Sequence, residues 1–337
     1  MRLWGFCCWL IISTLLMPVA FSQPDVEWDT LTFTLDNDLF ILAHSDGYYT
    51  NGLHVRLESK PFDEFNKNNS PFFLLPLLPF FPVVTDVFEQ RTLAYEFGQA
   101  MVTPADITIS VPQPDDLPYG GLLYAAADLN ARNTRYADTI RFMAGVVGPW
   151  SQADEVQQQI HRVTGSDEPN GWEYQLENEF VVNMMYERRT SFHTGQFESG
   201  FNYQWVRIQM AELGTINTGA EVSLALLITE QDMKHSHNLQ SSIAHNAYLF
   251  STDINRGFFA MLGVTGRLTL RNIFLDGNTF SDSPSVEKEL WSGGIFYGIG
   301  YATGKWNFSA SWVRETKRFE TQEGGFNYGS ITVTYRY

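Results

Sequence analysis

The chain ends on Ile331-Thr332-Val333-Thr334-Tyr335-Arg336-Tyr337, and this stretch decides the fold class. Apolar and aromatic side chains alternate with polar ones as far as the last residue, a period of two that predicts a β-strand. An amphipathic final strand with a terminal aromatic residue is typical of outer-membrane barrels, whose insertion machinery recognises it. Because a soluble domain has little reason to end in this way, we expect an outer-membrane β-barrel.

The same alternation recurs along the chain, for example at residues 30–36, 53–58 and 306–312. A polar face opposite a large apolar face suits a wall between lipid and a watery interior. A secreted soluble β-sandwich would give the same pattern in any single segment. The C-terminal strand therefore distinguishes the barrel from the sandwich. We predict an all-β fold, a transmembrane antiparallel β-barrel of outer-membrane type with a short helix in an extracellular loop. About twelve strands are expected, at 29–36, 49–59, 90–98, 119–130, 136–147, 174–187, 192–212, 219–229, 256–274, 289–302, 306–315 and 326–337.

An even number of strands places both ends of the chain on the periplasmic side and alternates the connections between the two ends of the barrel. The expected periplasmic turns at 131–135, 188–191 and 303–305 are short. Most of the expected outside connections are longer, at 37–48, 99–118, 148–173, 213–218, 275–288 and 316–325.

Two expected periplasmic connections, 60–89 and 230–255, are longer than this rule suggests. The first contains residues 71–82, Pro-Phe-Phe-Leu-Leu-Pro-Leu-Leu-Pro-Phe-Phe-Pro, whose four prolines break any α-helix. This run is also too short to span a membrane. We expect it to lie on the membrane surface or to cover the inner mouth of the barrel.

The N-terminus has the features of a secretory signal peptide. One positive charge precedes an apolar run at residues 3–21, with small residues at the cleavage positions. We divide the chain into a signal peptide, 1–22, and one barrel domain, 23–337; an uncleaved membrane anchor is the alternative. Cys7 and Cys8 fall in the segment to be removed, which excludes cysteine chemistry from the mature protein.

The mature chain is acidic and aromatic. Loss of Arg2 with the signal peptide takes the formal charge at pH 7 from −16 to −17. An acidic protein is a poor partner for nucleic acid, so no nucleic-acid function is expected. The predicted mature chain has no stretch of about 18 apolar residues that could form a transmembrane helix. An aromatic content of 15% suits a membrane barrel.

The first chemical candidate is the run Asp36-Asn37-Asp38, at the outer end of the first expected strand. Two carboxylates and an amide offer the hard oxygen ligands that Ca²⁺ takes. The alternative is a polar turn rich in Asp, Asn and Gly. The spacing is not that of an EF-hand loop.

The connection at 148–173 carries the second candidate. Ser151 is expected to cap a short helix that runs to about Val163. His161 falls near the end of this helix, and Asp167 and Glu168 follow it. A nearby carboxylate keeps an imidazole basic and oriented, which suits a general base. An ordinary surface histidine is the alternative, but the strand order places this connection on the same side as the first candidate.

A histidine metal site and a serine-hydrolase site have less support in the sequence. The spacing of His235-Ser236-His237 resembles that of metal ligands, but the strand order places these residues on the periplasmic side. The Gly-x-Ser-x-Gly motif of serine hydrolases is absent from the sequence.

Ordered motifs along the chain resemble those of one known family, the outer-membrane lipid A 3′-O-deacylases. The resemblance covers nearly the whole mature chain and also includes Gly148-Pro149 and His161. The longer motifs are Asn37-Asp38-Leu39-Phe40, Tyr48-Tyr49-Thr50-Asn51-Gly52, Gly98-Gln99-Ala100-Met101-Val102-Thr103-Pro104, Pro118-Tyr119-Gly120-Gly121-Leu122-Leu123-Tyr124, Gly171-Trp172-Glu173-Tyr174-Gln175, Leu275-Asp276-Gly277-Asn278-Thr279-Phe280 and Thr316-Lys317-Arg318-Phe319-Glu320.

The resemblance implies a twelve-stranded barrel with an active site between the barrel wall and a helix from an outside loop. It implies hydrolysis of the ester that holds the 3′-acyloxyacyl chain of lipid A, the membrane anchor of lipopolysaccharide, at the outer leaflet and with Ca²⁺. The family's catalytic histidine falls on His161, and its Asn-Asp pair, which contributes to catalysis and to the metal site, falls on Asn37 and Asp38.

The resemblance also implies a catalytic and metal-binding acid at Asp167, where the family has Glu; the adjacent Glu168 is an alternative ligand. Thr50, Tyr119 and Trp172 correspond to substrate-binding positions.

The implied mechanism resembles that of secreted phospholipase A2. His161 removes a proton from water, the water attacks the ester carbonyl, and Ca²⁺ stabilises the oxyanion. One departure from the family lies at Leu117, where Arg is usual. The absence of this Arg removes a bidentate phosphate contact, so we expect the details of substrate recognition to differ.

Two other functions fit the same strand pattern. A non-catalytic barrel, either a pore or an inactive relative, would share the alternation and the C-terminus. The convergence of Asn37, Asp38 and His161 at one end of the barrel argues against it. A surface phospholipase would use the same histidine and metal, and only its substrate would distinguish it.

Overall fold

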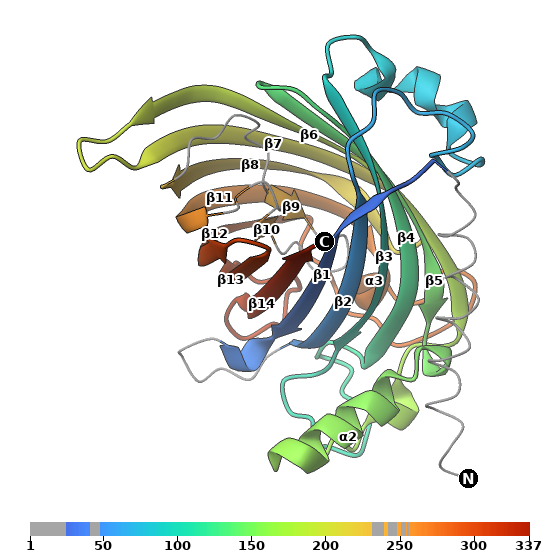
Figure 1. Cartoon of the computed structure of the whole chain (residues 1–337). Helices are drawn as coiled ribbons and strands as arrows, with labels where there is room; N and C mark the ends of the chain where they lie inside the picture. Colours follow the sequence, from blue (N-terminus) through green and yellow to red (C-terminus); the bar gives the residue numbers. More distant parts are fainter. Residues whose placement is uncertain (1–24, 41–47, 231–238, 242–247, 251–253, 255) are drawn as a thin grey trace.

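A computed structural model describes residues 25–40, 48–230, 239–241, 248–250, 254 and 256–337. Twelve strands close into one antiparallel barrel, which confirms the predicted fold class (Figure 1). The predicted signal peptide, 1–22, lies outside the described residues. In chain order the barrel strands are β1 (Trp28–Asn37), β2 (Tyr49–Ser59), β3 (Gln90–Val102), β4 (Gly120–Arg132), β5 (Tyr136–Val147), β6 (Glu179–Gln196), β7 (Asn202–Gly214), β8 (Asn217–Thr229), β11 (Arg256–Asn272), β12 (Trp291–Thr303), β13 (Trp306–Glu315) and β14 (Phe326–Arg336).

Two short strands, β9 (Leu239–Ser241) and β10 (Tyr248–Phe250), form a separate two-stranded sheet within the connection from β8 to β11. The start of β1 and the end of β14 lie at the same end of the barrel, since Thr30 is paired with Arg336. We call this the periplasmic end and the opposite one the outer end.

The C-terminal strand closes the barrel by pairing with β1. Thr332 and Thr334 face inward, where their hydroxyls lie 3.2 and 3.0 Å from those of Thr34 and Thr32. Phe33, between these two threonines, is 45% exposed on the outer face. The alternation at both ends of the sequence therefore separates a polar interior from an apolar exterior.

The outer wall carries large exposed apolar side chains on several strands, including Phe258, Leu262, Ile299, Phe308 and Ile331. This is the surface that a barrel presents to lipid. Among the described residues, no helix is both long and apolar enough to cross a membrane.

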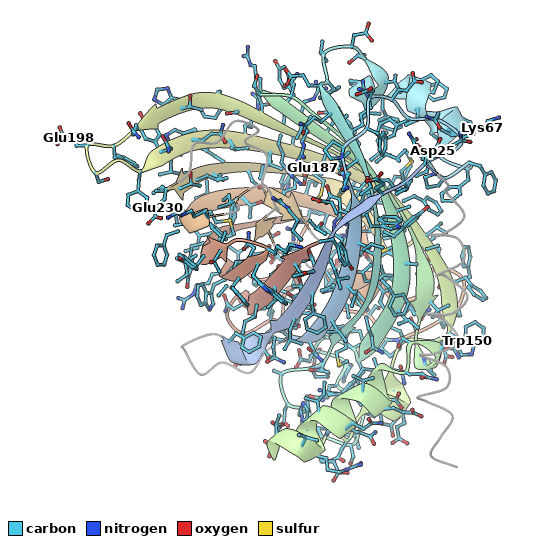
Figure 2. All side chains as sticks on the ribbon, viewed as in Figure 1. Asp25, Lys67, Trp150, Glu187, Glu198 and Glu230 are labelled. Carbon is cyan, nitrogen blue, oxygen red and sulfur yellow. The ribbon has the colours of Figure 1, made fainter. Side chains whose placement is uncertain are left out.

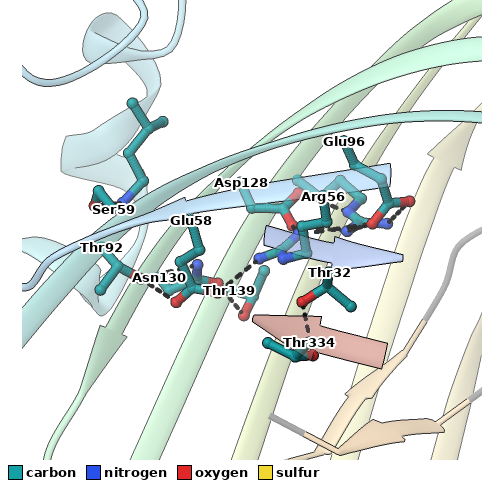
Figure 3. A network of polar contacts seen from close by, with 12 residues as sticks. Thr32, Arg56, Glu58, Ser59, Thr92, Glu96, Asp128, Asn130, Thr139 and Thr334 are labelled. Carbon is teal, nitrogen blue, oxygen red and sulfur yellow. Dashed lines mark hydrogen bonds and ion pairs between the residues drawn. The ribbon is translucent and has the colours of Figure 1, made fainter. Parts of the chain in front are cut away.

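Paired charges fill the middle of the barrel interior on the β2–β5 side (Figure 3). Asp128 accepts two hydrogen bonds from Arg141, at 2.6 and 2.7 Å, and a further one from Arg56. Arg141 also donates to Glu96 at 3.1 Å. All four side chains are buried, and buried charges persist in this way only when they are paired.

The predicted turn at 188–191 is wrong, because β6 continues to Gln196 and the hairpin turns at 197–201. Arg188 and Arg189 fall in the expected turn, but both side chains have partners along the wall. Arg188 donates to Asp138 on β5 at 2.6 and 2.8 Å, and Arg189 forms an ion pair with Glu187.

The proline-rich run 71–82 is not α-helical, as its prolines predicted. It contains the 3-10 helix η2 (Leu75–Phe80) and ends at the first residue of a second one, η3 (Pro82–Val84). The run does not cover the inner mouth, which was one of the two expected positions. It packs against the outside of the barrel at the periplasmic end, where the rings of Phe73 and Phe142 on β5 lie 5.2 Å apart.

Candidate active site

The outer end of the barrel carries the predicted extracellular helix, α2 (Ala153–Thr164), which projects below the barrel in Figure 1. The predicted cap is wrong. The Ser151 hydroxyl donates to the Gly148 carbonyl at 2.6 Å, and Gln152, in a left-handed conformation, occupies the N-cap position. Ser151 belongs instead to η4 (Pro149–Ser151), the short turn that leads from β5 into the helix.

The end of α2 positions His161. Gly165 ends the helix with φ at +75°, a conformation that glycine adopts without strain, and its amide donates to the His161 carbonyl at 2.8 Å. The chain then turns back, so that the Asp167 carbonyl lies 2.6 Å from His161 Nδ1. This reversal explains why the two residues, six apart in sequence, meet.

The Asp167 contact fixes the tautomer of His161. A backbone carbonyl can only accept a hydrogen bond, so Nδ1 must carry the proton. Neutral His161 therefore keeps the lone pair on Nε2 as a proton acceptor. The side chain is partly exposed, and among the described residues no hydrogen bond to Nε2 is found. This state is the one that a general base requires.

Tyr119 and Trp172 hold the helix against the barrel. Trp172, in η5 (Trp172–Tyr174), donates from its indole to Gln157 of α2 at 2.6 Å. Its ring packs against Tyr119 at 4.9 Å, and the Tyr119 hydroxyl donates to the Ile107 carbonyl at 3.1 Å. Burial raises the pKa of Tyr119 to about 12, so the phenol remains a donor.

Gly121 lets α2 approach the wall closely. A Cβ at this position would lie 2.3 Å from the Cβ of Ala153, the first residue of the helix, and 2.2 Å from Ser151 Oγ. The helix can therefore pack this closely against β4 only if residue 121 of the Pro118–Tyr124 motif has no side chain.

Asn37 and Asp38 lie at the same end, on the rim formed by β1. Asn37 is the last residue of the strand and is paired with Gly329 of β14. Asp38 opens η1 (Asp38–Phe40), which lies against Gly329 of β14 and accepts, at the Phe40 carbonyl, a 2.8 Å hydrogen bond from the indole of Trp312 on β13. Both candidate side chains are half-buried.

A buried relay that the sequence reading missed lies beneath this rim. His54 is 3% exposed and contacts Asp36 Oδ2 through Nε2 at 2.9 Å. Its Nδ1 contacts the Tyr124 hydroxyl at 2.8 Å, which in turn donates to Glu96 at 2.7 Å. Tyr49 donates to the same Asp36 oxygen at 3.2 Å. The available signal was the alternation of His54 on the inward face of its strand.

The structure does not bring the other predicted site residues together through side-chain contacts among the described residues. The side chains of Asp167 and Glu168 are exposed, and Asp167 reaches His161 through its carbonyl. Residue 50 lies on β2, but the Thr50 side chain is outside the described set, as are His235 and His237. Among described residues, no group of three His, Cys, Asp or Glu is arranged to hold a metal ion. The donor types at the outer end, amide and carboxylate oxygens, do fit Ca²⁺.

Leu117, at the position where the related deacylases carry Arg, is buried and packs into the core at the outer end. With Tyr119 it lines a mostly apolar pocket of about 160 Å³, which loop residues 104–119, 171–174 and 284–285 enclose in part. The departure from the family motif therefore replaces a charged group with apolar packing beside an open pocket.

Comparison with known proteins identifies the family. A family model described as outer membrane protein LpxR matches residues 6–337. The chain belongs to the LpxR family. Among solved structures, LpxR from Salmonella typhimurium matches with a TM-score of 0.72 and 17% identity, covering 91% of this chain and 100% of that chain.

More distant barrels also match. The β domain of the Bordetella autotransporter Brka has a TM-score of 0.41 and 10% identity, covering 92% of this chain and 97% of its own. The translocator domain of NalP from Neisseria meningitidis has a TM-score of 0.35 and 11% identity, with coverages of 97% and 95%. No curated protein matches the chain in a sequence comparison.

Membership of the LpxR family confirms the predicted location in the outer membrane. It also implies lipid A 3′-O-deacylation for this chain.

Proposed function

We propose that this LpxR-family barrel hydrolyses the ester-linked 3′-acyloxyacyl chain of lipid A at the outer leaflet, with His161 as the general base. The observation that carries the proposal is the hydrogen bond between His161 Nδ1 and the Asp167 carbonyl, because it leaves Nε2 ready to accept a proton. The helix that bears His161 projects from the outer end of the barrel (Figure 1), and lipid A of the outer leaflet would lie at that end.

In the proposed reaction, Nε2 takes a proton from water while the water oxygen bonds to the ester carbonyl carbon. The bond between this carbon and the 3′ oxygen of lipid A then breaks, and the imidazolium returns its proton to that oxygen. The products are a free acyloxyacyl carboxylic acid and lipid A with a 3′ hydroxyl. Proton transfer by a positioned base contributes about 10²–10⁴ in rate.

Asn37 and Asp38, together with either Asp167 or the adjacent Glu168, are the residues that we propose to hold Ca²⁺. Their oxygen atoms suit a hard cation, and the two pairs belong to the rim of β1 and to the turn after α2. When bound, the ion would supply positive charge beside the developing oxyanion and the substrate phosphates. Asn37 and Asp38 are fixed by the barrel wall and by η1, which keeps the rim in place before substrate arrives.

Thr50, Tyr119 and Trp172 are proposed substrate contacts. Tyr119 has the most direct support, because it lines the apolar pocket beside α2 and an acyl chain needs such a surface. Trp172 is buried, and its ring packs against the Tyr119 ring that lines this pocket.

Mass spectrometry of purified lipid A incubated with the refolded barrel tests the proposal. With Ca²⁺ we expect loss of the 3′-acyloxyacyl mass, and with excess chelator no loss. Parallel incubation with phospholipid covers the alternative of a surface phospholipase. If only phospholipid is cleaved, the proposed substrate is wrong; full activity under chelation would remove calcium from the mechanism.

Two matched variants, Asp167→Asn and Glu168→Gln, identify the acidic ligand. A carboxylate that binds Ca²⁺ should, when neutralised, raise the calcium concentration needed for half-maximal activity. The other variant should leave this concentration unchanged, since both side chains are exposed and contribute little to the fold. Equal calcium dependence in wild type and both variants would exclude this turn from the metal site.

A further inference from the structure

Residues 71–88, which we call the apolar segment, form the second half of the connection from β2 to β3 at the periplasmic end. In Figure 1 they include the light-blue coils above the barrel. The segment contains one charged residue, Asp86. Neither the fold of the barrel nor the proposed reaction requires such a surface.

One side of the apolar segment covers the outer wall of the barrel. Leu129 and Ile140 face outward, because Asp128 and Arg141, next to them on β4 and β5, bond to each other inside. The segment and the wall form one buried cluster, which includes Leu74, Leu78, Val83, Phe88, Leu93, Leu129 and Ile140.

Hydrogen bonds fasten the segment in this position. Arg91 of β3 donates to the carbonyl oxygens of Val83, Thr85 and Phe88, at 3.2, 2.9 and 3.3 Å. Asn133, in the turn after β4, donates to the Val87 carbonyl at 2.6 Å. The segment is therefore a fixed part of the outer wall rather than a loose loop.

The other side of the segment is uncovered and mostly apolar. Phe72 is 81% exposed and Phe80 is 80% exposed, and Val84 and Val87 are exposed further along, together with Thr85 and Asp86. A fixed surface of this kind, with large rings directed away from the protein, is costly in water.

The backbone of the segment is suited to a medium that offers few hydrogen bonds. Its four prolines have no N–H to satisfy. Several remaining amides donate within the segment, among them those of Leu77, Phe81 and Thr85, at 2.9–3.0 Å. In lipid an unsatisfied backbone group costs several kcal/mol, so internal pairing of this kind favours a membrane setting.

A cluster of aromatic and basic side chains on β5 and β6 marks the level of the segment along the barrel. Tyr136, Tyr186 and Arg188 lie on the outer face at the periplasmic end, with the Arg188 guanidinium 5.4 Å from the Tyr136 ring. Such residues mark the boundary between lipid and water in membrane barrels. The Phe81 ring lies 5.3 Å from that of Tyr186, which places the segment at this boundary.

We propose that the apolar segment inserts Phe72 and Phe80 among the acyl chains of the periplasmic leaflet of the outer membrane and so anchors one side of the barrel. The partner is phospholipid, recognised through its hydrocarbon rather than its phosphate, because the segment offers no cation. Its apolar surface continues that of the lipid-facing wall onto which it packs.

Nitroxide labels at single cysteines test this insertion. Both native cysteines lie at positions 7 and 8, so the mature chain supplies a cysteine-free background. Phe72→Cys and Phe80→Cys are compared with Leu262→Cys on the lipid-facing wall and with Glu198→Cys at the tip of the β6–β7 hairpin, labelled in Figure 2. Each labelled barrel is placed in phosphatidylcholine vesicles, and collisions with oxygen and with a water-soluble nickel complex are measured.

The expected ratio of oxygen to nickel collisions at positions 72 and 80 is several-fold above that at 198 and close to that at 262. A ratio at positions 72 and 80 that equals the ratio at 198 would overturn the proposal, because both rings would then lie in water. Protection from both reagents, with spectral broadening that disappears on dilution with unlabelled protein, would also overturn it. In that case a second copy of the chain, and not lipid, would cover the segment.

Discussion

His54 and His161 present the same imidazole in opposite settings. His54 is buried inside the barrel, and both of its ring nitrogens are engaged, one by Asp36 and the other by Tyr124. His161 lies at the outer end on α2, where one nitrogen is held by a backbone carbonyl and the other faces no hydrogen-bond partner among the described residues. The two contacts of His54 are both to buried side chains of the wall, whereas His161, held at Nδ1, keeps Nε2 available for a substrate.

The contrast extends to the surrounding charges. Glu96, Asp128 and Arg141 are buried and form ion pairs inside the barrel, so removing one partner should lower the free energy of unfolding of the barrel. Asp167 and Glu168, at the rim, are exposed and contribute little to folding. Substitutions in the two regions should therefore affect different properties of the protein.

The largest effect is expected at His161. His161→Ala removes the base and should lower turnover of purified lipid A by about 10²–10⁴. The temperature at which the folded, fast-migrating band is lost on gels should not change, because the side chain is partly exposed and its hydrogen bond goes to the Asp167 carbonyl of the same connection. A matched control is His193→Ala on β6, near the periplasmic end. Equal losses of turnover in His161→Ala and His193→Ala would show that His161 has no special role in catalysis.

Asp128→Asn tests the buried side. It weakens the pairing of Arg141 and Arg56 in the interior, and breaking a buried ion pair typically costs about 3–5 kcal/mol. We expect the folded band to be lost at a much lower temperature, while the fraction that remains folded keeps its turnover. Glu27→Gln, which removes an exposed pair with Lys60, should leave the unfolding temperature unchanged. Equal unfolding temperatures for the two variants would contradict the structural role.

His54→Gln separates the two histidines most sharply. The shorter amide cannot reproduce both contacts, and an unsatisfied buried group costs about 1–3 kcal/mol. The free energy of unfolding in urea should fall by that amount, and turnover should change far less than in His161→Ala. If turnover vanished and the free energy of unfolding were unaltered, His54 would belong to the reacting groups.

Gly165→Ala should strain only the turn after α2, and it should have the smallest effect on the stability of the barrel. Nothing lies within 4 Å of the added Cβ, so the cost comes from φ at +75° alone, about 1–2 kcal/mol. The strain should loosen the turn that brings the Asp167 carbonyl to His161 and lower turnover without changing barrel unfolding. Gly304→Ala, at a positive φ in a periplasmic turn, is the control. Its turnover should match that of wild type, and a drop in both variants would argue for a general effect.

Much of the fold could be predicted because a barrel wall repeats one simple rule. The inward threonines of β1 and the outward Phe33 follow directly from alternation, and so does the closing strand at the C-terminus. The β6–β7 turn could not be placed, since Arg188 finds its partner Asp138 on another strand. Such a partner is set by register, which local sequence does not contain.

The sequence offered candidate site residues, but it could not give their contacts. The family motifs marked His161 and Asp167, but they suggested a carboxylate where the structure uses the backbone carbonyl. The Asp36–His54–Tyr124 relay joins three strands, and no spacing along the chain reveals it. Tertiary hydrogen bonds of this kind become visible only when the strands are paired.

Lipid A from living cells tests the central claim most directly. The chain and its His161→Ala variant are expressed in a strain that lacks 3′-deacylation, and lipid A is extracted and weighed by mass spectrometry. We predict that wild type yields lipid A without the 3′-acyloxyacyl chain, while His161→Ala yields the fully acylated form at equal barrel content in the outer membrane. Fully acylated lipid A from cells with folded wild-type barrel, or deacylated lipid A from the variant, would contradict the account.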